Sequence, residues 1–275
     1  MRLSIAFSPC PNDTFIFDAL INNKIDRGGI DFTVALEDVE TLNKNAKEGR
    51  YDISKISFGA YPLVYQKYNL LNSGSALGKG VGPLLIAAKA EELSNVENNI
   101  VAIPGEHTTA HFLFSAAFPL AKQKIFLRYD EIEDFVLNGN GMGVIIHENR
   151  FTYQQKGLVK LMDLGDYWEK KTQKLIPLGG IVMRRSFDMA LKKKVDQLIR
   201  NSIEYAFKNS TGLNAYIRDH ALEMDDETMK KHIDLYVNEY SLNLGADGKS
   251  AIKSMMNYLE FAKEDVDSGT SFFYD

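Results

Sequence analysis

The chain reads SPCPNDT at residues 8–14, between an apolar strand pattern at residues 3–7 and a helical pattern that follows. Two prolines restrict the path of this loop, and Asn12, Asp13 and Thr14 are all suitable N-caps for the helix. A helix that starts just beyond a strand presents unpaired N–H groups there, a position that suits a carboxylate or another anion. The stretch predicts a βα turn able to bind an anion, although a capped turn without a ligand fits it equally.

Strand and helix patterns alternate along the first half of the chain. They do so over residues 1–90 and again over residues 100–147, as is typical of parallel sheets built from βαβ units. The segment 175–183 has the pattern of an extended stretch that crosses back to the first unit. Helical patterns fill the remainder of the chain, at residues 187–208, 211–220, 226–239 and 247–263.

We therefore predict an α/β, two-lobed fold like that of the type II periplasmic binding proteins, with a cleft between the lobes. The expected larger lobe is discontinuous and comprises residues 1–92 and 184–275, with the C-terminal helices packed on it. Residues 93–183 form the expected smaller lobe. Clefts between lobes are preferred places for ligands. A single doubly wound domain with a helical extension is the alternative fold.

Composition and charge narrow the classes of function. The chain has 275 residues, of which 45% are hydrophobic and 25% charged, and its formal net charge is −5. With no long basic stripe, nucleic acid is not an expected partner. The single cysteine, Cys10, excludes an intrachain disulfide, and without a Cys/His cluster no structural zinc site is expected. The N-terminal apolar run is too short for a signal peptide and no stretch has the length of a membrane span, so we expect a cytoplasmic protein.

Three loops leave strand patterns and enter helical patterns with small polar residues, at residues 8–14, 54–57 and 105–110. Because ligands bind outside the carboxyl ends of parallel strands, we expect all three loops to face one crevice. Hydroxyls, backbone N–H groups and Lys55 favour an acidic ligand. None of the loops has the spacing of a P-loop or of a dinucleotide fingerprint, so neither ATP nor a dinucleotide is indicated.

His147 is the best candidate for acid–base chemistry. It follows the apolar strand pattern 144–146 and precedes Glu148 and Arg150, which could tune its proton affinity. A histidine that binds a backbone carbonyl at a strand end is the structural alternative. The remaining histidines have weaker patterns: capping or packing is expected for His107 and His111, and surface positions for His220 and His232.

Two further side chains near these segments have open roles. Cys10 lies near a helix N-terminus, where a thiolate is stabilised, but the sequence shows no base beside it. Tyr153 follows His147 closely enough to line the same cleft.

Four segments together resemble the 1,4-dihydroxy-6-naphthoate synthases of the futalosine route to menaquinone. They are SPCPNDTF at 8–15, KIS at 55–57, the segment 105–110 with its Thr-Thr-Ala, and IHENRFTY at 146–153, with PLGG at 177–180 also fitting. The first and fourth segments are specific, and the others would be weak alone. The resemblance runs in order from residue 3 to about residue 185.

This resemblance implies a carbon–carbon lyase that converts cyclic dehypoxanthine futalosine, an aromatic carboxylic acid, into 1,4-dihydroxy-6-naphthoate without cofactor or metal. It implies that His147 is the proton acceptor and that Lys55, Ile56, Ser57, Thr109 and Ala110 contact the substrate. Such bond cleavage beside a carbonyl needs a base and donors for the oxyanion. The full substrate-binding set that we predict is Asn12, Asp13, Lys55, Ile56, Ser57, Thr108, Thr109, Ala110 and Arg150.

Three other functions compete with this interpretation. A receptor for a small aromatic carboxylate would have the same fold, but the expected cytoplasmic location is against it. Chorismate dehydratase, the sister enzyme of the pathway, shares the fold, whereas the segments at 8–13 and 146–148 favour the synthase. A regulator with a binding-protein-like effector domain lacks support because no helix-turn-helix pattern is visible. The sequence leaves the oligomeric state open.

Overall fold

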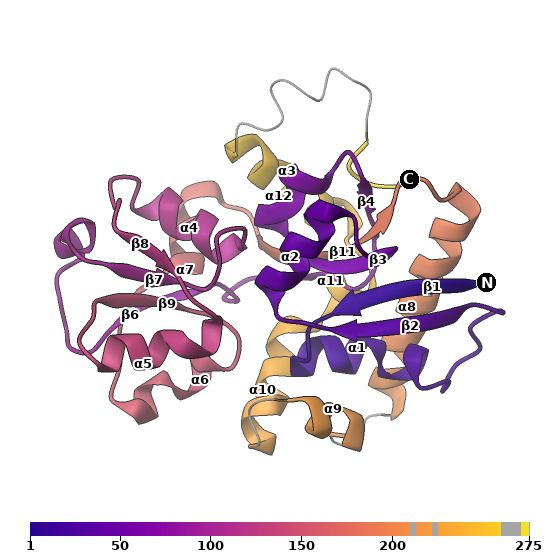
Figure 1. The fold of residues 1–275 in the computed structure, drawn as a ribbon, viewed down its shortest axis with the longest axis horizontal. Helices are drawn as coiled ribbons and strands as arrows, with labels where there is room; N and C mark the ends of the chain where they lie inside the picture. Colours follow the sequence, from indigo (N-terminus) through magenta and orange to yellow (C-terminus); the bar gives the residue numbers. More distant parts are fainter. Residues whose placement is uncertain (210–212, 222–224, 260–270, 275) are drawn as a thin grey trace.

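The computed structural model describes residues 1–209, 213–221, 225–259 and 271–274, which form two lobes side by side (Figure 1). Each lobe is built on its own sheet. One sheet has six strands in the order β2-β1-β3-β11-β4, with β5 paired to β11, and the other has five strands in the order β10-β6-β9-β7-β8. The predicted two-lobed α/β fold is confirmed.

The six-stranded sheet combines early strands with one that arrives late in the chain. Its parallel part pairs β1 with β2 and β3, and β11 then pairs antiparallel with β3, β4 and β5. The predicted crossing segment 175–183 is thus confirmed as β11. The strands are β1 (Arg2–Phe7), β2 (Asp31–Leu36), β3 (Ile53–Ser57), β4 (Tyr68–Leu70), β5 (Ala76–Gly78) and β11 (Ile176–Arg184).

The five-stranded sheet is mixed. β7 pairs parallel with β8 and β9, whereas β6 pairs antiparallel with β9 and β10. Its strands are β6 (Leu84–Ala87), β7 (Val101–Ile103), β8 (Lys124–Phe126), β9 (Met142–Ile145) and β10 (Val159–Asp163). β6 lies within the range 1–92 expected for the larger lobe, and β11, except for its last residue Arg184, lies within the range 93–183 expected for the smaller one. The exact lobe boundaries stay a prediction.

Helices cover both sheets. Those of the first two thirds of the chain are α1 (Pro11–Ile21), α2 (Val39–Glu48), α3 (Tyr61–Val64), α4 (Thr109–Ala117), α5 (Ile132–Leu137), α6 (Asn149–Thr152) and α7 (Leu164–Thr172). The C-terminal helices, drawn in orange and yellow in Figure 1, are α8 (Met189–Asn209), α9 (Ala215–His220), α10 (Asp226–Tyr236), α11 (Glu239–Leu242) and α12 (Gly245–Tyr258).

The C-terminal part is helical as predicted, with different helix ends. The single helix expected at 226–239 is divided, because the Asn238 side chain accepts from the N–H of Tyr240 and starts α11. Parts of the helices expected at 211–220 and 247–263 fall on 210–212 and 260–270, outside the described residues. Among the described helices, none is both long and apolar enough to cross a membrane.

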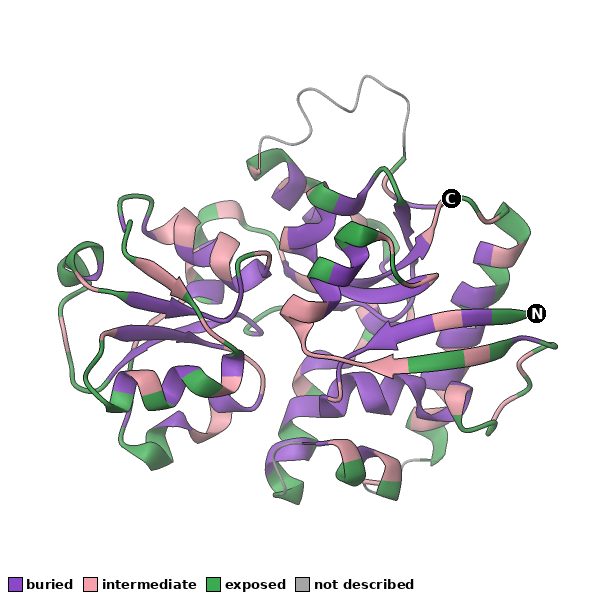
Figure 2. Ribbon diagram, viewed as in Figure 1, coloured by how far each residue is buried: buried purple, intermediate pink, exposed green. Residues whose placement is uncertain are grey.

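α1 starts earlier than its sequence pattern predicts. Its N-cap is Cys10 and its first residue is Pro11, whose fixed φ and missing N–H suit that position. The predicted caps Asn12, Asp13 and Thr14 therefore lie inside the first turn. α1 is buried over nearly its whole length (Figure 2), against α8, α9 and α10.

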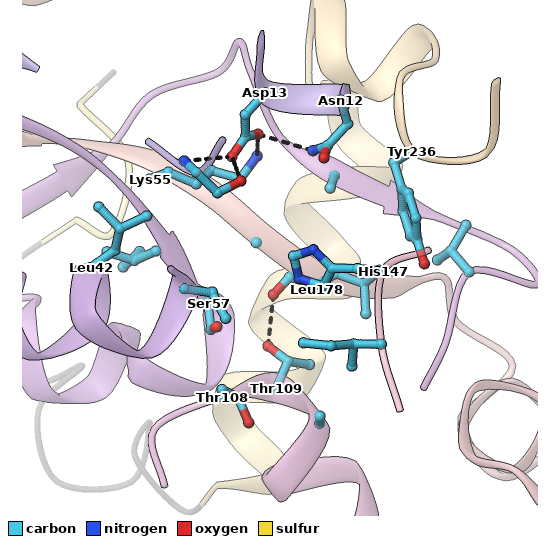
Figure 3. A pocket seen from close by; sticks show the side chains of 18 of the residues that line it. Asn12, Asp13, Leu42, Lys55, Ser57, Thr108, Thr109, His147, Leu178 and Tyr236 are labelled. Atoms are coloured by element: carbon cyan, nitrogen blue, oxygen red, sulfur yellow. Dashed lines mark hydrogen bonds and ion pairs between the residues drawn. The ribbon is translucent and has the colours of Figure 1, made fainter. Parts of the chain in front are cut away.

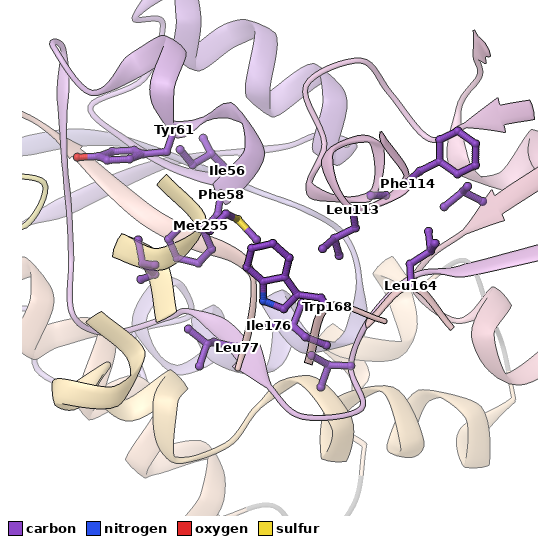
Figure 4. Packing of buried hydrophobic residues seen from close by; sticks show 14 of the residues in the cluster. Ile56, Phe58, Tyr61, Leu77, Leu113, Phe114, Leu164, Trp168, Ile176 and Met255 are labelled. Carbon is purple, nitrogen blue, oxygen red and sulfur yellow. The ribbon is translucent and has the colours of Figure 1, made fainter. Parts of the chain in front are cut away.

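One apolar cluster continues from lobe to lobe. Trp168 of α7 is fully buried in it, with its ring 5.4 Å from Phe112 and 5.5 Å from Tyr258. The same cluster includes Phe58 beside β3 and Met255 of α12 (Figure 4). Packing of this kind joins the lobes through apolar contact as well as through the crossing strands.

Candidate active site

A cavity opens between the lobes, lined by residues of both. Nine of the ten predicted site residues line it, and Arg150 alone does not. The three loops at strand ends thus meet at one place, as expected. The structure brings together the predicted residues Asn12, Asp13, Lys55, Ile56, Ser57, Thr108, Thr109, Ala110 and His147.

The larger lobe contributes a buried ion pair. Lys55 Nζ lies 3.1 Å from Asp13 Oδ1, and both side chains are almost fully buried. Asp13 Oδ1 also accepts from Asn12 Nδ2 at 2.9 Å, while Asp13 Oδ2 accepts from the N–H and hydroxyl of Ser8 at 3.2 and 2.7 Å. Figure 3 shows this network above the cavity. The Asp13 carboxylate is thus fully satisfied by the protein.

Lys55 retains capacity for a ligand. Its ammonium group has three N–H donors, and two are used by Asp13 and by the carbonyl of Gly74, at 3.0 Å. Ser57 is similar, since its Oγ accepts from Asn43 Nδ2 at 3.2 Å and its own hydroxyl hydrogen remains to be donated. Asn43, which the sequence did not single out, fixes Ser57 further by accepting its N–H at 2.8 Å.

The smaller lobe contributes the N-terminus of α4. Thr108 caps this helix by accepting from the N–H of His111, and the Thr109 hydroxyl donates to the carbonyl of Leu178 at 2.7 Å. Both threonine hydroxyls donate to backbone carbonyls and thereby orient the first turn of α4. Gly59 approaches this turn so closely that a Cβ there would lie 2.8 Å from the carbonyl oxygen of Thr108.

His147 follows β9 with a left-handed backbone, at φ +58°, which is uncommon for a residue with a side chain. Its ring stacks on Tyr129 with centroids 5.0 Å apart, and its Nδ1 lies 2.8 Å from Cys10 Sγ of the larger lobe. Among the described residues, Nε2 of His147 has no hydrogen-bond partner. Burial lowers the pKa of His147 to about 4, the nearby Asp13 carboxylate opposing this shift. The ring is therefore neutral at pH 7.

Cys10 is a buried thiol in this arrangement. Burial raises its pKa well above the usual value, and the Glu148 carboxylate acts in the same direction. A protonated thiol is a poor nucleophile, so the geometry favours a contact role with His147. Cys10, His147 and Glu148 place three potential metal-ligating atoms within 4.8 Å of one another, the one such group among the described residues.

His232 is not at the surface, contrary to the sequence interpretation. Its side chain is almost fully buried and lines the cavity, as does Tyr236 one turn later on α10. His232 Nε2 lies 3.1 Å from Asn12 Oδ1. The helical spacing of Met229, His232 and Tyr236 placed them on one face, which was the signal available in the sequence.

Arg150 and Tyr153 point elsewhere. The Arg150 guanidinium donates to the carbonyls of Gly80 and Gly82 and pairs with Asp163 at 3.3 Å, so it ties segments of the smaller lobe together. Tyr153 is buried in the apolar cluster of that lobe. The expectation that Tyr153 lines the cleft was wrong, because the helical turn after His147 directs it inward.

The other histidines make local contacts. His107 Nδ1 lies 3.4 Å from Glu40 Oε1, and His111 Nδ1 lies 2.8 Å from the carbonyl oxygen of Glu106. These contacts fit the expected capping and packing roles of the two residues.

Comparison with known proteins identifies the relatives of this site. The menaquinone-biosynthesis family matches residues 3–260. A 1,4-dihydroxy-6-naphthoate synthase of Thermus thermophilus is 43% identical over 251 residues, which cover 91% of each chain. The enzyme of the same name from Streptomyces coelicolor is 38% identical over 260 residues, covering 92% of this chain and 91% of the relative.

Solved structures support the two-lobed fold. A protein of Archaeoglobus fulgidus superposes with a TM-score of 0.87 at 29% identity, over 96% of this chain and 98% of that protein. The periplasmic aliphatic sulphonate-binding protein of Escherichia coli superposes with a TM-score of 0.64 at 12% identity, over 94% and 86% of the two chains, and shows the fold alone. The family match over residues 3–260 and the two sequence relatives establish that the chain belongs to the menaquinone-biosynthesis family, in which the relatives named above are 1,4-dihydroxy-6-naphthoate synthases.

Proposed function

We propose that this chain is itself a 1,4-dihydroxy-6-naphthoate synthase that cleaves cyclic dehypoxanthine futalosine with His147 as general base. The observation that carries the proposal is a neutral histidine in the same cavity as a set of anion-binding groups from both lobes. The enzyme names of the two sequence relatives support it.

His147 has the properties of a base. Its Nδ1 is occupied by Cys10, which leaves Nε2 as the nitrogen that meets the substrate. When the ring proton is on Nδ1, the Nε2 lone pair accepts a proton from the carbon acid of the substrate. A substrate carboxylate bound in the cavity would favour the imidazolium form and so raise the proton affinity of His147 during the reaction.

The remaining groups suit an aromatic carboxylate. The third N–H of Lys55, the hydroxyl of Ser57 and the backbone N–H groups at the start of α4 can donate to the carboxylate or to a developing oxyanion. Apolar side chains of Leu42, Ile56 and Leu178 line the same cavity and suit the flat ring system.

No step of this proposal uses a cofactor or metal. The buried Cys10 thiol and the His147 ring contact one another directly, so a metal at this position would have to displace that contact. The cytoplasmic location and the identity of the aromatic carboxylate stay predictions.

Two alternatives can be separated from it. The receptor function is not favoured, because the binding-protein similarity cited above, at 12% identity, concerns the fold, whereas the relatives at 43% and 38% identity are named as enzymes. Chorismate dehydratase activity is distinguishable by substrate.

The test is to incubate purified protein with cyclic dehypoxanthine futalosine, or separately with chorismate, and to identify products by mass spectrometry. His147→Ala is assayed alongside the control His220→Ala. Among the described residues, the His220 ring contacts the carbonyl and ring of Tyr216 on its own helix. Dihydroxynaphthoate from wild type and His220→Ala, but little from His147→Ala, would support the proposal. Binding without product would indicate a receptor, and turnover of chorismate would indicate the sister enzyme.

A further inference from the structure

His232 lines the cavity but has no part in the chemistry described so far. It lies on α10, which packs against α1 of the larger lobe, and its side chain is almost fully buried. A buried imidazole is costly unless its two nitrogens are both used. The partners of these nitrogens therefore indicate what the residue does.

The Nε2 atom of His232 carries a proton. Asn12 Nδ2 donates to Asp13 Oδ1, which fixes the orientation of the Asn12 amide and leaves its Oδ1 as an acceptor. His232 Nε2 lies 3.1 Å from that oxygen and must donate to it. In a neutral ring, Nδ1 of His232 is then an acceptor.

The Nδ1 atom of His232 is buried and has no hydrogen-bond partner among the described residues. The nearest charged atom is Glu148 Oε2, at 3.6 Å. A lone pair facing a carboxylate oxygen is unfavourable, whereas one proton between them makes a hydrogen bond after a shift of about half an ångström. The geometry therefore favours a single proton shared by Glu148 and His232.

We propose that His232 is a positioning residue for His147 and acts through Glu148. Glu148 directly follows His147, whose left-handed backbone needs support from its surroundings. A bond from His232 to Glu148 holds the peptide that carries the base. Because His232 belongs to the larger lobe and Glu148 follows β9 of the smaller one, the bond also sets the distance between the two walls.

Several groups face His232 and share its electrostatic environment. They are the His147 ring at 5.8 Å, the Tyr236 ring at 4.7 Å and Glu148. Burial lowers the pKa of His232 well below the usual value, with a further decrease from His147.

Two substitutions separate the two nitrogens of His232. In His232→Gln the side-chain amide can reach the Nε2 position and keep the bond to Asn12, but nothing replaces Nδ1. In His232→Asn the amide lies near the Nδ1 position and the contact with Asn12 is lost. We expect kcat of His232→Gln to fall about 10- to 100-fold with KM changed less than threefold, as for a misplaced base, and His232→Asn to retain more activity.

Glu148 provides the second arm of the test. If both residues act as one unit, Glu148→Gln lowers kcat to a similar extent. The kcat of the double variant Glu148→Gln/His232→Gln is then no lower than that of the less active single variant. Multiplicative losses in the double variant would overturn the proposal. Glu148→Gln leaves His232 in place and serves if the His232 variants do not fold.

The turnover arm of this inference rests on the proposed function, so one readout avoids turnover. Imidazole ¹⁵N spectra of the substrate-free protein report the protonation of each ring nitrogen of His147. We expect the titration midpoint of His147 to move in His232→Gln and to stay in the matched control His220→Gln. If the titration midpoint of His147 stayed the same in both variants, or if His232→Gln raised KM with kcat unchanged, the positioning role would be overturned. Absence of product from the wild type would instead refute the proposed function and leave this measurement decisive.

Discussion

The two walls of the cavity are built differently. On the larger lobe, Asp13 receives two donors from Ser8, one from Asn12 and the charge of Lys55, all within that lobe. On the smaller lobe, His147 has a strained backbone, and its ring nitrogen contacts Cys10 of the opposite lobe. The first wall is complete once its own lobe folds, whereas the second depends on the lobes meeting. The ion-pair network of the first wall therefore needs only the larger lobe, whereas the ring contact of the base needs both lobes.

The largest expected effect concerns the base itself. His147→Ala should lower kcat by about 10²- to 10⁴-fold, the usual contribution of a general base, while the ligand affinity stays nearly unchanged. Steady-state rates and calorimetric titration measure the two quantities. If the affinity fell in parallel with turnover, His147 would belong functionally to the binding wall, and turnover close to wild type would remove it from the mechanism.

The next effect concerns the stability that the buried Asp13–Lys55 pair gives to the wall of the larger lobe. Lys55→Met leaves the Asp13 carboxylate buried without its cation, and we expect the free energy of unfolding to fall by about 3–5 kcal/mol. Adding Asp13→Asn should recover part of this loss. Urea denaturation gives the values, with Lys170→Met as control, because its pair with Asp166 is exposed and should contribute little to stability. Equal effects of the two lysines would contradict the comparison.

The contribution of His147 to the free energy of unfolding should depend on pH. The pKa of His147 is about 4 in the folded protein and close to 6.5 in the unfolded chain, so the unfolded state binds more protons between these values. The free energy of unfolding should fall as the pH decreases from about 6.5 to 4, by at most about 3 kcal/mol from this residue.

His147→Asn should flatten that dependence. In the active enzyme, the acid limb of kcat/KM should lie near pH 4 to 5, because this limb reports the base of the free enzyme. An acid limb near 6.5 would show that His147 is better solvated than the structure indicates.

The smallest effect concerns the contact between the walls. Cys10→Ala removes the partner of His147 Nδ1 and should lower kcat about three- to tenfold, the value of one hydrogen bond, whereas Cys10→Ser should retain most activity. Equal losses in both variants would indicate that the sulfur itself, rather than a hydrogen-bonding atom, is required.

Local patterns predicted much of the fold and most of the site. The loops at 8–14, 54–57 and 105–110 were recognised because small polar residues follow apolar runs, and parallel strands bring such loops to one edge. The late crossing strand β11 was also visible. The pairing between short strands far apart in the sequence could not be predicted. β6 and β10 each have at most five residues, and their antiparallel partners decide which lobe they join.

The wrong predictions of side-chain position have a common physical cause. His232 lies among charged residues of α10, so its sequence surroundings indicated a surface, but the helix turns this residue onto α1. Arg150 is adjacent in sequence to the base region, yet the backbone carbonyls of Gly80 and Gly82 attract its guanidinium away from the cavity. Contacts between elements far apart in the chain settle such orientations, and periodicity carries little information about them.

The order of residues around the cavity has a consequence for synthesis on the ribosome. The lining starts with Ser8 and ends with Tyr236, and the strands of the smaller lobe are translated without interruption between residues 84 and 163. The smaller lobe can fold while the nascent chain still lacks β11, a strand that the six-stranded sheet of the larger lobe requires. The last element that lines the cavity to be translated is α10. His147 is therefore present in the nascent chain long before the cavity can enclose a substrate.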